Sequence, residues 1–356
     1  MGVGSMRRTI ATALLSVSVL LLIAGPAAAC GGLVGANGSI NLLRTATLAA
    51  YHDGIEHYIT SFEFAGGGAE FGSIVPLPGI PSEVKRGGDW TLQRLQQEVA
   101  PPQRNALVAN DVAQGASAEK AEVILEAEID ALDITVLKGG GDEVGIWAKD
   151  NGFELPPDAP EVLDFYADRS PIFMAARFDI GRAAELNQGI GDGTPIHVVI
   201  PTPNPWVPLR ILGLGRQPEE VIEADVFLLT DARPTLLPGP GTSDAAEGLT
   251  VERSEEVSTQ LLFDLRSDKG MRWLPADDMH LTYMKIDATA GELSHDLAID
   301  ATGTAIPSRI AAGLAAPAAH WPDPATVPWA LWAMAAALGL GMVVVLAKGA
   351  SIQRPL

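Results

Sequence analysis

The chain has one cysteine, Cys30, among 356 residues. A lone thiol cannot close a disulfide within the chain, so the fold must be stabilised by its apolar core alone. Residues 30–300 are numerous enough to bury such a core, in one large domain or two closely joined ones. Apart from Cys30 itself, that stretch contains no cysteine that could act as a nucleophile.

Basic residues are scarce as well: 24 Lys and Arg stand against 44 Asp and Glu, a formal net charge of −20. Four of the basic residues, Arg7, Arg8, Lys348 and Arg354, lie in terminal segments without acids, so the stretch between them is more negative still. Such acidity argues against binding to nucleic acid or to anionic lipid. It suits cations or basic partners, although high acidity is more often only a feature of solubility.

Recognisable catalytic motifs are also absent. The sequence contains no Gly-x-Ser-x-Gly elbow and no His-Glu-x-x-His helix. The glycine groups at 66–68 and 213–215 lack the strand, turn and helix of a phosphate-binding fingerprint. We therefore assign no catalytic, cofactor-binding or metal-binding residue from the sequence, and we expect no cofactor.

One group of residues comes nearest to a metal site. His52, Asp53, Glu56 and His57 crowd a predicted hairpin tip and could hold a metal through imidazole and carboxylate ligands. Glu56 and His57 are neighbours on a strand, however, and should point to opposite faces. A polar hairpin tip is therefore the better interpretation.

Other charged or histidine positions have simpler interpretations. Asp192-Gly193 and the pair Asp277-Asp278 lack the alternating oxygen ligands of a calcium loop, so solvated turns are expected there. His197 lies within an apolar strand and is expected to be a hydrogen-bonded core histidine rather than a base.

The N-terminal residues 1–29 are typical of a secretory signal peptide. Two arginines precede an apolar run at 10–23, and three alanines ending at Ala29 provide a cleavage site. An uncleaved anchor is the alternative, but the run is short for a membrane span. Cys30 follows this site and could become a lipid-modified N-terminus. Ala27 stands where a lipobox usually has leucine, however, so an ordinary cysteine after the cleavage site is the other interpretation.

The C-terminal part is typical of a membrane anchor. Residues 328–347 contain no charge and, at ~1.5 Å per residue, are just long enough to cross the hydrocarbon. An Ala- and Pro-rich linker at 301–327 precedes them, with tryptophans near the outer end, and Lys348 follows. The positive-inside rule then puts the tail, 348–356, in the cytoplasm. We expect a single-pass type I protein of the cell membrane with its large domain, 30–300, outside the cytoplasm.

Between these ends, strands and helices alternate without a strict βαβ rhythm, which predicts an α+β domain with a mixed, mainly antiparallel sheet and flanking helices. Asp53-Gly54 should join strands at 44–51 and 55–64 in a hairpin. The Pro-, Gly- and Asp-rich residues 231–248 form the longest expected internal loop and the natural place for a subdomain boundary. Further strands are expected at 71–75, 122–129, 132–137, 172–178, 196–200, 223–230 and 279–286, and helices at 89–99, 142–147, 160–166 and 254–265.

Two apolar runs lead straight into prolines, at residues 70–81 and 196–206. Proline lacks the backbone donor that a central strand needs, so each run should be a strand that ends abruptly. We interpret the two as paired exits from one shared sheet, a pattern that an internal duplication would leave.

Several short motifs in a fixed order suggest a family. They are Ala29-Cys30-Gly31-Gly32, Phe71 to Pro78 with Ile80-Pro81, Trp147 before Asn151-Gly152-Phe153 and Leu155-Pro156, Leu163 to Tyr166, Phe173 to Arg177, Pro201 to Arg210, and Val226 to Leu229. Over residues 29–235 the chain thereby resembles the uncharacterised exported bacterial family named domain of unknown function twenty-three-thirty. The resemblance implies export and a coherent fold, and no activity. The family pattern often has a second cysteine after Cys-Gly-Gly, where this chain has Leu33-Val34-Gly35.

The anchor, the linker and the missing motifs favour a membrane-tethered module of the cell envelope that binds a protein or ligand partner. The alternative is an envelope enzyme, hydrolase-like, whose residues meet only in three dimensions. An enzyme should have a concave pocket on which titratable groups converge, whereas an exposed apolar patch would favour the binding module.

Overall fold

The computed structural model describes residues 32–35, 42–64, 71–99, 121–186, 194–239 and 248–317. The chain divides into two compact units, 1–316 and 317–356, and the description below concerns the first. Among the described residues, no helix has the length and apolarity to cross a membrane. The predicted signal peptide, 1–29, the predicted anchor, 328–347, and the tail, 348–356, lie outside the described residues.

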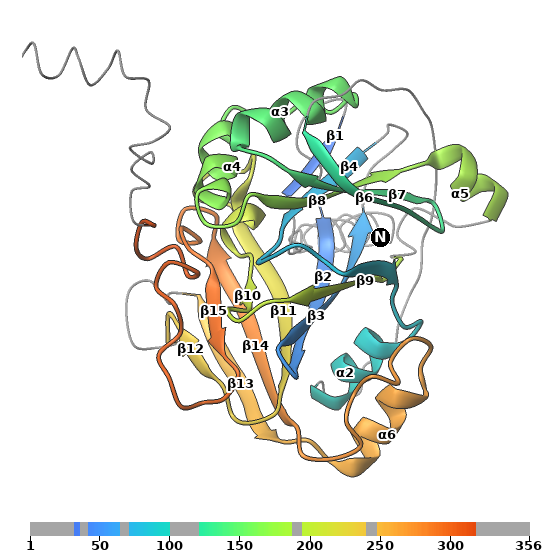
Figure 1. The fold of residues 1–356 in the computed structure, drawn as a ribbon, viewed down its shortest axis with the longest axis vertical. Helices are drawn as coiled ribbons and strands as arrows, with labels where there is room; N and C mark the ends of the chain where they lie inside the picture. Colours follow the sequence, from blue (N-terminus) through green and yellow to red (C-terminus); the bar gives the residue numbers. More distant parts are fainter. Residues whose placement is uncertain are drawn as a thin grey trace, which may run out of the picture. The chain divides into compact units, whose positions relative to one another are not determined.

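Three β-sheets contain the described strands (Figure 1). The large sheet has seven: β2 (Leu42–His52), β3 (Ile55–Phe64), β5 (Glu83–Arg86), β9 (Ile196–Pro201), β11 (Val221–Thr230), β13 (Leu249–Glu256) and β14 (His280–Thr289). The five-stranded sheet has β1 (Gly32–Gly35), β4 (Phe71–Pro76), β6 (Glu122–Ile129), β7 (Leu132–Lys138) and β8 (Ile172–Phe178). The small sheet has β10 (Trp206–Val207), β12 (Thr235–Leu237) and β15 (Leu297–Asp300).

The strand order is β13-β14-β11-β2-β3-β9-β5 in the large sheet, β1-β4-β8-β7-β6 in the second and β10-β15-β12 in the third. Among the described strands, every pair is antiparallel except β11 with β2. The described helices are α2 (Thr91–Val99), α3 (Gly141–Asp150), α4 (Ala159–Ala167), α5 (Ile180–Leu186) and α6 (Thr259–Ser267), with the 3-10 helix η1 (Arg210–Gly213). The predicted α+β class with a mainly antiparallel sheet is confirmed.

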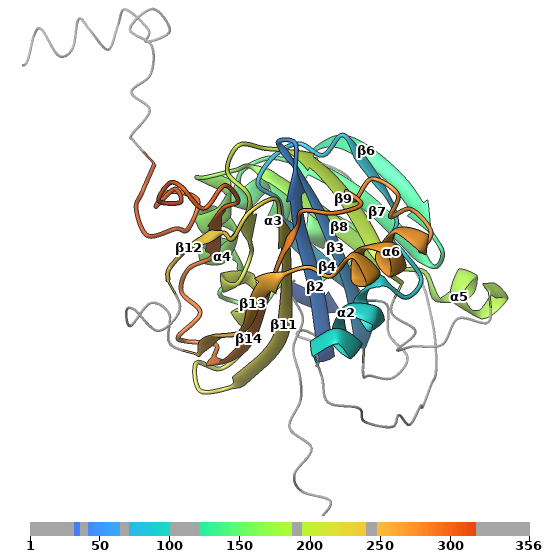
Figure 2. The same ribbon diagram turned by 90° about the horizontal axis from the view of Figure 1, so that it is seen from below.

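The two larger sheets face each other across an apolar core. Tyr58 and Val198 of the large sheet pack in one buried cluster with Val136 and Met174 of the five-stranded sheet. A second cluster joins α3 and α4 to the other face of the five-stranded sheet, and a third joins α2 and α6 to the other face of the large sheet. The helix pairs therefore lie on opposite sides of the sheets (Figures 1 and 2).

The β2–β3 hairpin forms as predicted. Asp53 and Gly54 have φ angles of 51° and 79°, the consecutive positive values of a tight two-residue turn. Aspartate tolerates this conformation better than most residues do, and glycine adopts it without steric cost.

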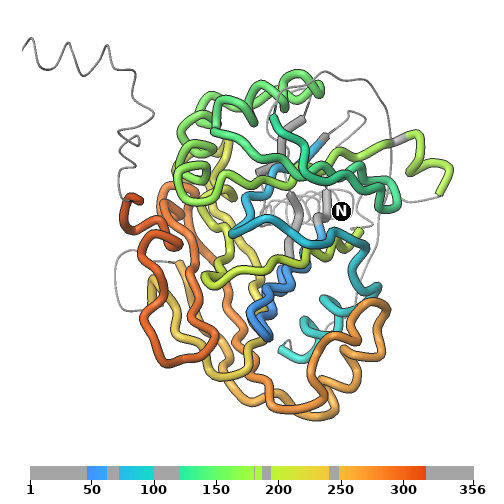
Figure 3. The backbone as a smooth tube through the Cα atoms, in the orientation of Figure 1, coloured from blue at the N-terminus to red at the C-terminus, as the bar shows by residue number. Residues whose placement is uncertain are grey.

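The interpretation of the two proline-terminated strands is half right. β4 ends at Pro76 and β9 at Pro201, as the missing backbone donors require. They do not share a sheet, however, because β4 pairs with β8 in the five-stranded sheet and β9 with β3 in the large one. Between the two larger sheets, the chain crosses after β1, β3, β4, β5 and β8, and its course can be followed in Figure 3. Proline content identifies where a strand ends but not which strand lies beside it.

Among the predicted segments whose bounds differ in the structure, three differ for an identifiable reason. Residues 254–256 end strand β13, and α6 begins only at Thr259, after Ser258 accepts a hydrogen bond from the Leu261 amide as its N-cap. Residues 231–248 are not wholly loop, since β12 lies within them. Helix α2 begins at Thr91 rather than Asp89, because the distant Asp268 carboxylate accepts hydrogen bonds from the amides of Asp89 and Trp90, the two residues before the helix.

Candidate ligand-binding site

A line of polar side chains crosses the large sheet. Cross-strand pairing joins its five members in the order Glu256, His280, Thr230, Tyr51 and Glu56. Directly paired residues project from the same face of a sheet, so these side chains share one face. The line therefore runs from the edge strand β13 to β3, deep in the sheet.

The next line, two residues along each strand, shows which face this is. It pairs Ser254 with Thr282, Thr282 with Leu228, and Leu228 with Ala49. Leu228 and Ala49 belong to the apolar core between the two larger sheets. Both lines therefore lie on the inner face, and their polar members at β13 and β14 continue that face toward the edge of the sheet.

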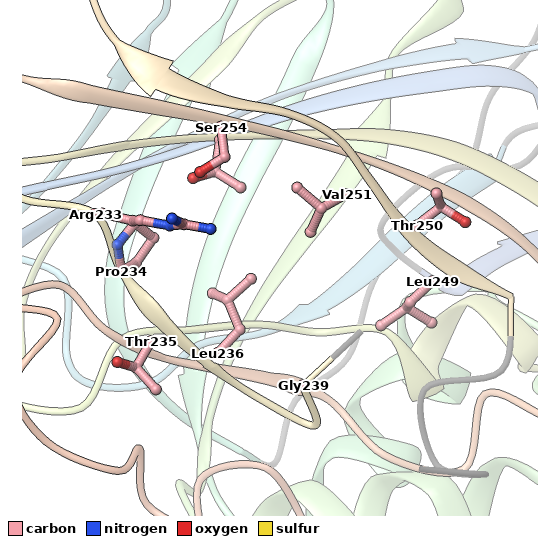
Figure 4. Close-up of a pocket in the computed structure, with 10 residues that line it drawn as sticks. Arg233, Pro234, Thr235, Leu236, Gly239, Leu249, Thr250, Val251 and Ser254 are labelled. Atoms are coloured by element: carbon pink, nitrogen blue, oxygen red, sulfur yellow. The ribbon is translucent and has the colours of Figure 1, made fainter. Parts of the chain in front are cut away.

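A cavity of about 600 Å³ lies at this edge, between β12 of the small sheet and β13 of the large one (Figure 4). Its volume is within the range of ligand pockets, roughly 300–1,000 Å³. Arg233, Pro234, Thr235, Leu236 and Gly239 line one wall, and Leu249, Thr250, Val251, Ser254 and Thr282 line the other. Among the described residues, the lining thus combines hydroxyl groups and aliphatic side chains with one charged group.

Arg233 supplies that charge. Its side chain extends toward Ser254 and Leu236 in Figure 4. Among the described residues it forms no ion pair, although most described arginines do. Arg233 is exposed, so water can solvate its guanidinium, and the same group is open to an anion that enters the cavity.

Ser254, which lines the cavity, contacts His280 of the neighbouring strand. The serine Oγ lies 2.9 Å from the histidine Nε2. Burial lowers the pKa of His280, as does the charge of Arg233, while Glu256 and Glu255 oppose the shift. The imidazole is therefore neutral at neutral pH, and its Nε2 can accept the hydrogen bond that the serine hydroxyl donates.

Thr282 also lines the cavity, and its hydroxyl lies buried in the wall. The residue is 2% exposed, and its Oγ1 has almost no accessible surface and no hydrogen-bond partner among the described residues. Leaving such a group unpaired costs on the order of 1–3 kcal/mol, and a ligand oxygen would recover that free energy if a small shift of the wall exposed the hydroxyl.

Glu56 ends the polar line in the interior. The residue is 0% exposed, and neither carboxylate oxygen has a partner in normal hydrogen-bond geometry. Burial raises the pKa of Glu56 to about 8, and the nearby Trp206 amide offsets this only in part. Glu56 is therefore protonated and uncharged at neutral pH.

The hairpin-tip residues considered from sequence do not assemble into a metal site. His52 bonds to Asp231 at 2.6 Å, and Glu56 lies on the opposite face from His57, as predicted. Among the described residues, no cluster of three or more metal-ligating side chains exists. Asp278 lies in an exposed turn with a φ of 58°, and Asp192 lies outside the described residues.

His197 is a hydrogen-bonded core histidine, as predicted. Its Nε2 lies 2.9 Å from Nδ1 of His57, whose ring stacks on Trp273 at a centroid distance of 3.5 Å. Burial lowers the pKa of His57 to about 4 and of His197 to about 3, with Lys85 adding to both shifts. Both rings are neutral packing groups beneath Trp273.

Sequence reasoning missed the residues that form the cavity wall. The sequence predicts a helix at 254–265, which includes Ser254, and a loop at 231–248, which includes Arg233, so neither residue has a predicted neighbour. The available signal was the largely polar and charged run from Thr250 to Glu256, which is typical of an edge strand, here with a bulge between Val251 and Arg253.

Comparison with models of known protein families identifies a family for the chain. Residues 24–235 match the model of a family described as an uncharacterized protein conserved in bacteria (DUF2330). The chain belongs to this family. The matched region includes Arg233 and ends within β12, so the β13–β14 wall of the cavity lies beyond it.

No curated protein sequence matches the chain. Among solved structures, it is similar to baculovirus P35, at 8% identity and a TM-score of 0.38, over 74% of this chain and 97% of that one. A mutated baculovirus P35 after caspase cleavage gives 7% identity and a TM-score of 0.36, over 72% and 99%. TM-scores this low do not establish a common fold, and nothing about this chain follows from the similarity.

Proposed function

We propose that the chain is an exported, membrane-tethered module of the cell envelope that binds a small carboxylate ligand in the cavity between β12 and β13. Export and tethering are supported by the sequence of residues 1–29 and 328–347. The observation that carries the binding proposal is the cavity lining, where Arg233 lacks an ion-pair partner among the described residues and Thr282 has a buried, unsatisfied hydroxyl.

The lining also indicates the class of ligand. A guanidinium pairs with a carboxylate through two parallel hydrogen bonds, and the Thr282 hydroxyl can donate to the same group. Leu236, Leu249 and Val251 provide apolar surface along the rest of the cavity. The expected ligand therefore has one carboxylate and an aliphatic or acyl portion, as an N-acylated amino acid or a peptide C-terminus does.

The test compares two probes that differ only in charge, N-acetyl-leucine and N-acetyl-leucine amide. The full chain is placed in nanodiscs of zwitterionic lipid, and the affinities are measured by calorimetry. We expect the acid to bind about tenfold more tightly than the amide, because one charge-assisted hydrogen bond contributes roughly 1.5–3 kcal/mol.

A matched pair of variants separates the cavity from general electrostatics. Arg233→Gln should abolish the preference for the acid, whereas Arg272→Gln, which removes the same charge from an exposed position outside the cavity lining, should preserve it. Equal binding of acid and amide to the unaltered chain, or loss of the preference in both variants, would overturn the proposal.

A further inference from the structure

The geometry points to Ser254 as a nucleophile and His280 as its general base, for hydrolysis of a carboxylic ester that enters the cavity. The inference rests on the proposed function, because it requires the cavity to admit an acyl ligand. It also names catalytic residues for the hydrolase-like envelope enzyme, the alternative function that the sequence left open.

The first support is the distance between the two groups. Ser254 Oγ and His280 Nε2 are 2.9 Å apart, which is the contact that an activated serine makes with its base. Both residues lie on paired strands of a seven-stranded sheet, so the contact is held by the backbone ladder and not by a loop. Glu256 pairs directly with His280 across the strands, where its carboxylate can stabilise the imidazolium that forms.

The second support is a pair of hydrogen-bond donors on residues that line the same cavity. Thr282 pairs directly with Ser254, and its buried hydroxyl has no partner among the described residues. Arg233 lines the same cavity and is close enough to lower the pKa of His280. A hydroxyl and a guanidinium that are already in place are the kind of donors that stabilise a developing oxyanion.

The first half of the reaction forms an acyl-enzyme. Ser254 Oγ attacks the ester carbonyl carbon while its proton passes to His280 Nε2, and the carbonyl electrons move to the oxygen that Arg233 and Thr282 face. Collapse of this adduct breaks the bond to the alkoxy group, which leaves as the alcohol after taking the proton from His280.

Water completes the cycle. It attacks the acyl carbon and gives one proton to His280, and the Ser254 oxygen leaves and recovers that proton. Ester and water become carboxylic acid and alcohol, with no oxidant or metal needed. The product is a carboxylate, the ligand class that Arg233 is proposed to hold.

The experiment measures covalent labelling of the full chain in nanodiscs by an alkyl fluorophosphonate, with the modified residue located by peptide mass spectrometry. We expect one label per chain, on Ser254. His280→Gln should slow labelling by about 100-fold, the lower end of what a general base contributes. Ser267→Ala, which removes an exposed serine of α6, should label at the unaltered rate.

The possible results separate this inference from the binding proposal. Absence of label from Ser254, or equal labelling rates in the unaltered chain and in His280→Gln, overturns the assignment of Ser254 as a nucleophile activated by His280. If N-acetyl-leucine still binds in an Arg233-dependent way, the binding proposal survives that result. If neither labelling nor binding occurs, both fail. Thermal unfolding of His280→Gln within a few degrees of the unaltered chain shows that slow labelling reports a lost base and not a lost fold.

Discussion

At the scale of single residues, two of the buried polar groups that lack a hydrogen-bond partner among the described residues bear on the predictions. Glu56 has no normal hydrogen bond in the core, and Thr282 has none at the cavity. Native interiors rarely leave buried polar atoms unsatisfied. The effect of Glu56 on the free energy of unfolding depends on pH. The free energy lost at the unpaired Thr282 hydroxyl would be recovered if a ligand formed a hydrogen bond with it.

Glu56 should make the folded state less stable as the pH rises. Its pKa is about 8 when folded and near 4.5 when unfolded, so between these values only the folded chain holds the proton. Stability is then lost on going from about pH 4.5 to pH 8, at up to about 1.4 kcal/mol per pH unit. Glu56→Gln, which stays neutral, should be more stable than the unaltered chain at pH 8 and similar at pH 4.5.

Urea unfolding at the two pH values measures this difference. Glu223→Gln, on an exposed position of β11, serves as the control and should not change the pH dependence. A Glu56→Gln chain that loses stability between pH 4.5 and pH 8 as steeply as the unaltered chain would show that Glu56 is not the group responsible.

Thr282→Val should separate stability from binding. Valine has nearly the same shape and no hydroxyl, so the unfolding free energy of the free chain should rise by about 1 kcal/mol. Binding of N-acetyl-leucine should weaken at the same time, since the donor is gone. Unfolding and calorimetry on the same preparations test both effects. A variant that binds N-acetyl-leucine as well as the unaltered chain does would show that Thr282 does not contribute to the site.

At the scale of elements, one carboxylate joins several segments. Asp296 is completely buried and accepts hydrogen bonds from Tyr166 Oη at 2.8 Å, Arg169 at 2.6 Å and the Leu209 amide at 2.7 Å. Helix α4, its C-terminal flank and the segment before η1 thus converge on a residue next to β15.

Asp296→Asn should therefore destabilise the chain strongly. Removing the charge leaves the Arg169 side chain, which is 4% exposed, without a counterion, and breaking a buried pair in this way costs about 3–5 kcal/mol. Glu154→Gln, an exposed acid between α3 and α4, should change the unfolding free energy little. A loss below about 1 kcal/mol in Asp296→Asn would mean that the network contributes little to the fold.

The elements also show which parts of the structure can be predicted from the sequence. The Asp53-Gly54 turn and the strand at 196–201 depend on local chemistry, and both were predictable. The start of α2 depends on Asp268 and the cavity depends on β12 meeting β13, which are contacts between residues far apart in the sequence. Local periodicity carries no information about such contacts, so the candidate site was not predictable although most strands were.

At the scale of the whole molecule, the proposal of an envelope module makes a prediction about topology. The full chain, expressed in a bacterium with an epitope tag after Leu356, should lose its large domain when protease is added to spheroplasts and retain the tag. The tag should disappear only after detergent opens the membrane. A large domain that survives protease until the membrane is opened would contradict both export and the type I orientation.

The most direct test of the binding proposal is an experimental structure of the full chain with bound N-acetyl-leucine. We predict its carboxylate within hydrogen-bond distance of the Arg233 guanidinium and the Thr282 hydroxyl, with the leucine side chain against Leu236 and Val251. A ligand bound elsewhere, or a cavity that stays empty at saturating concentration, would contradict the account.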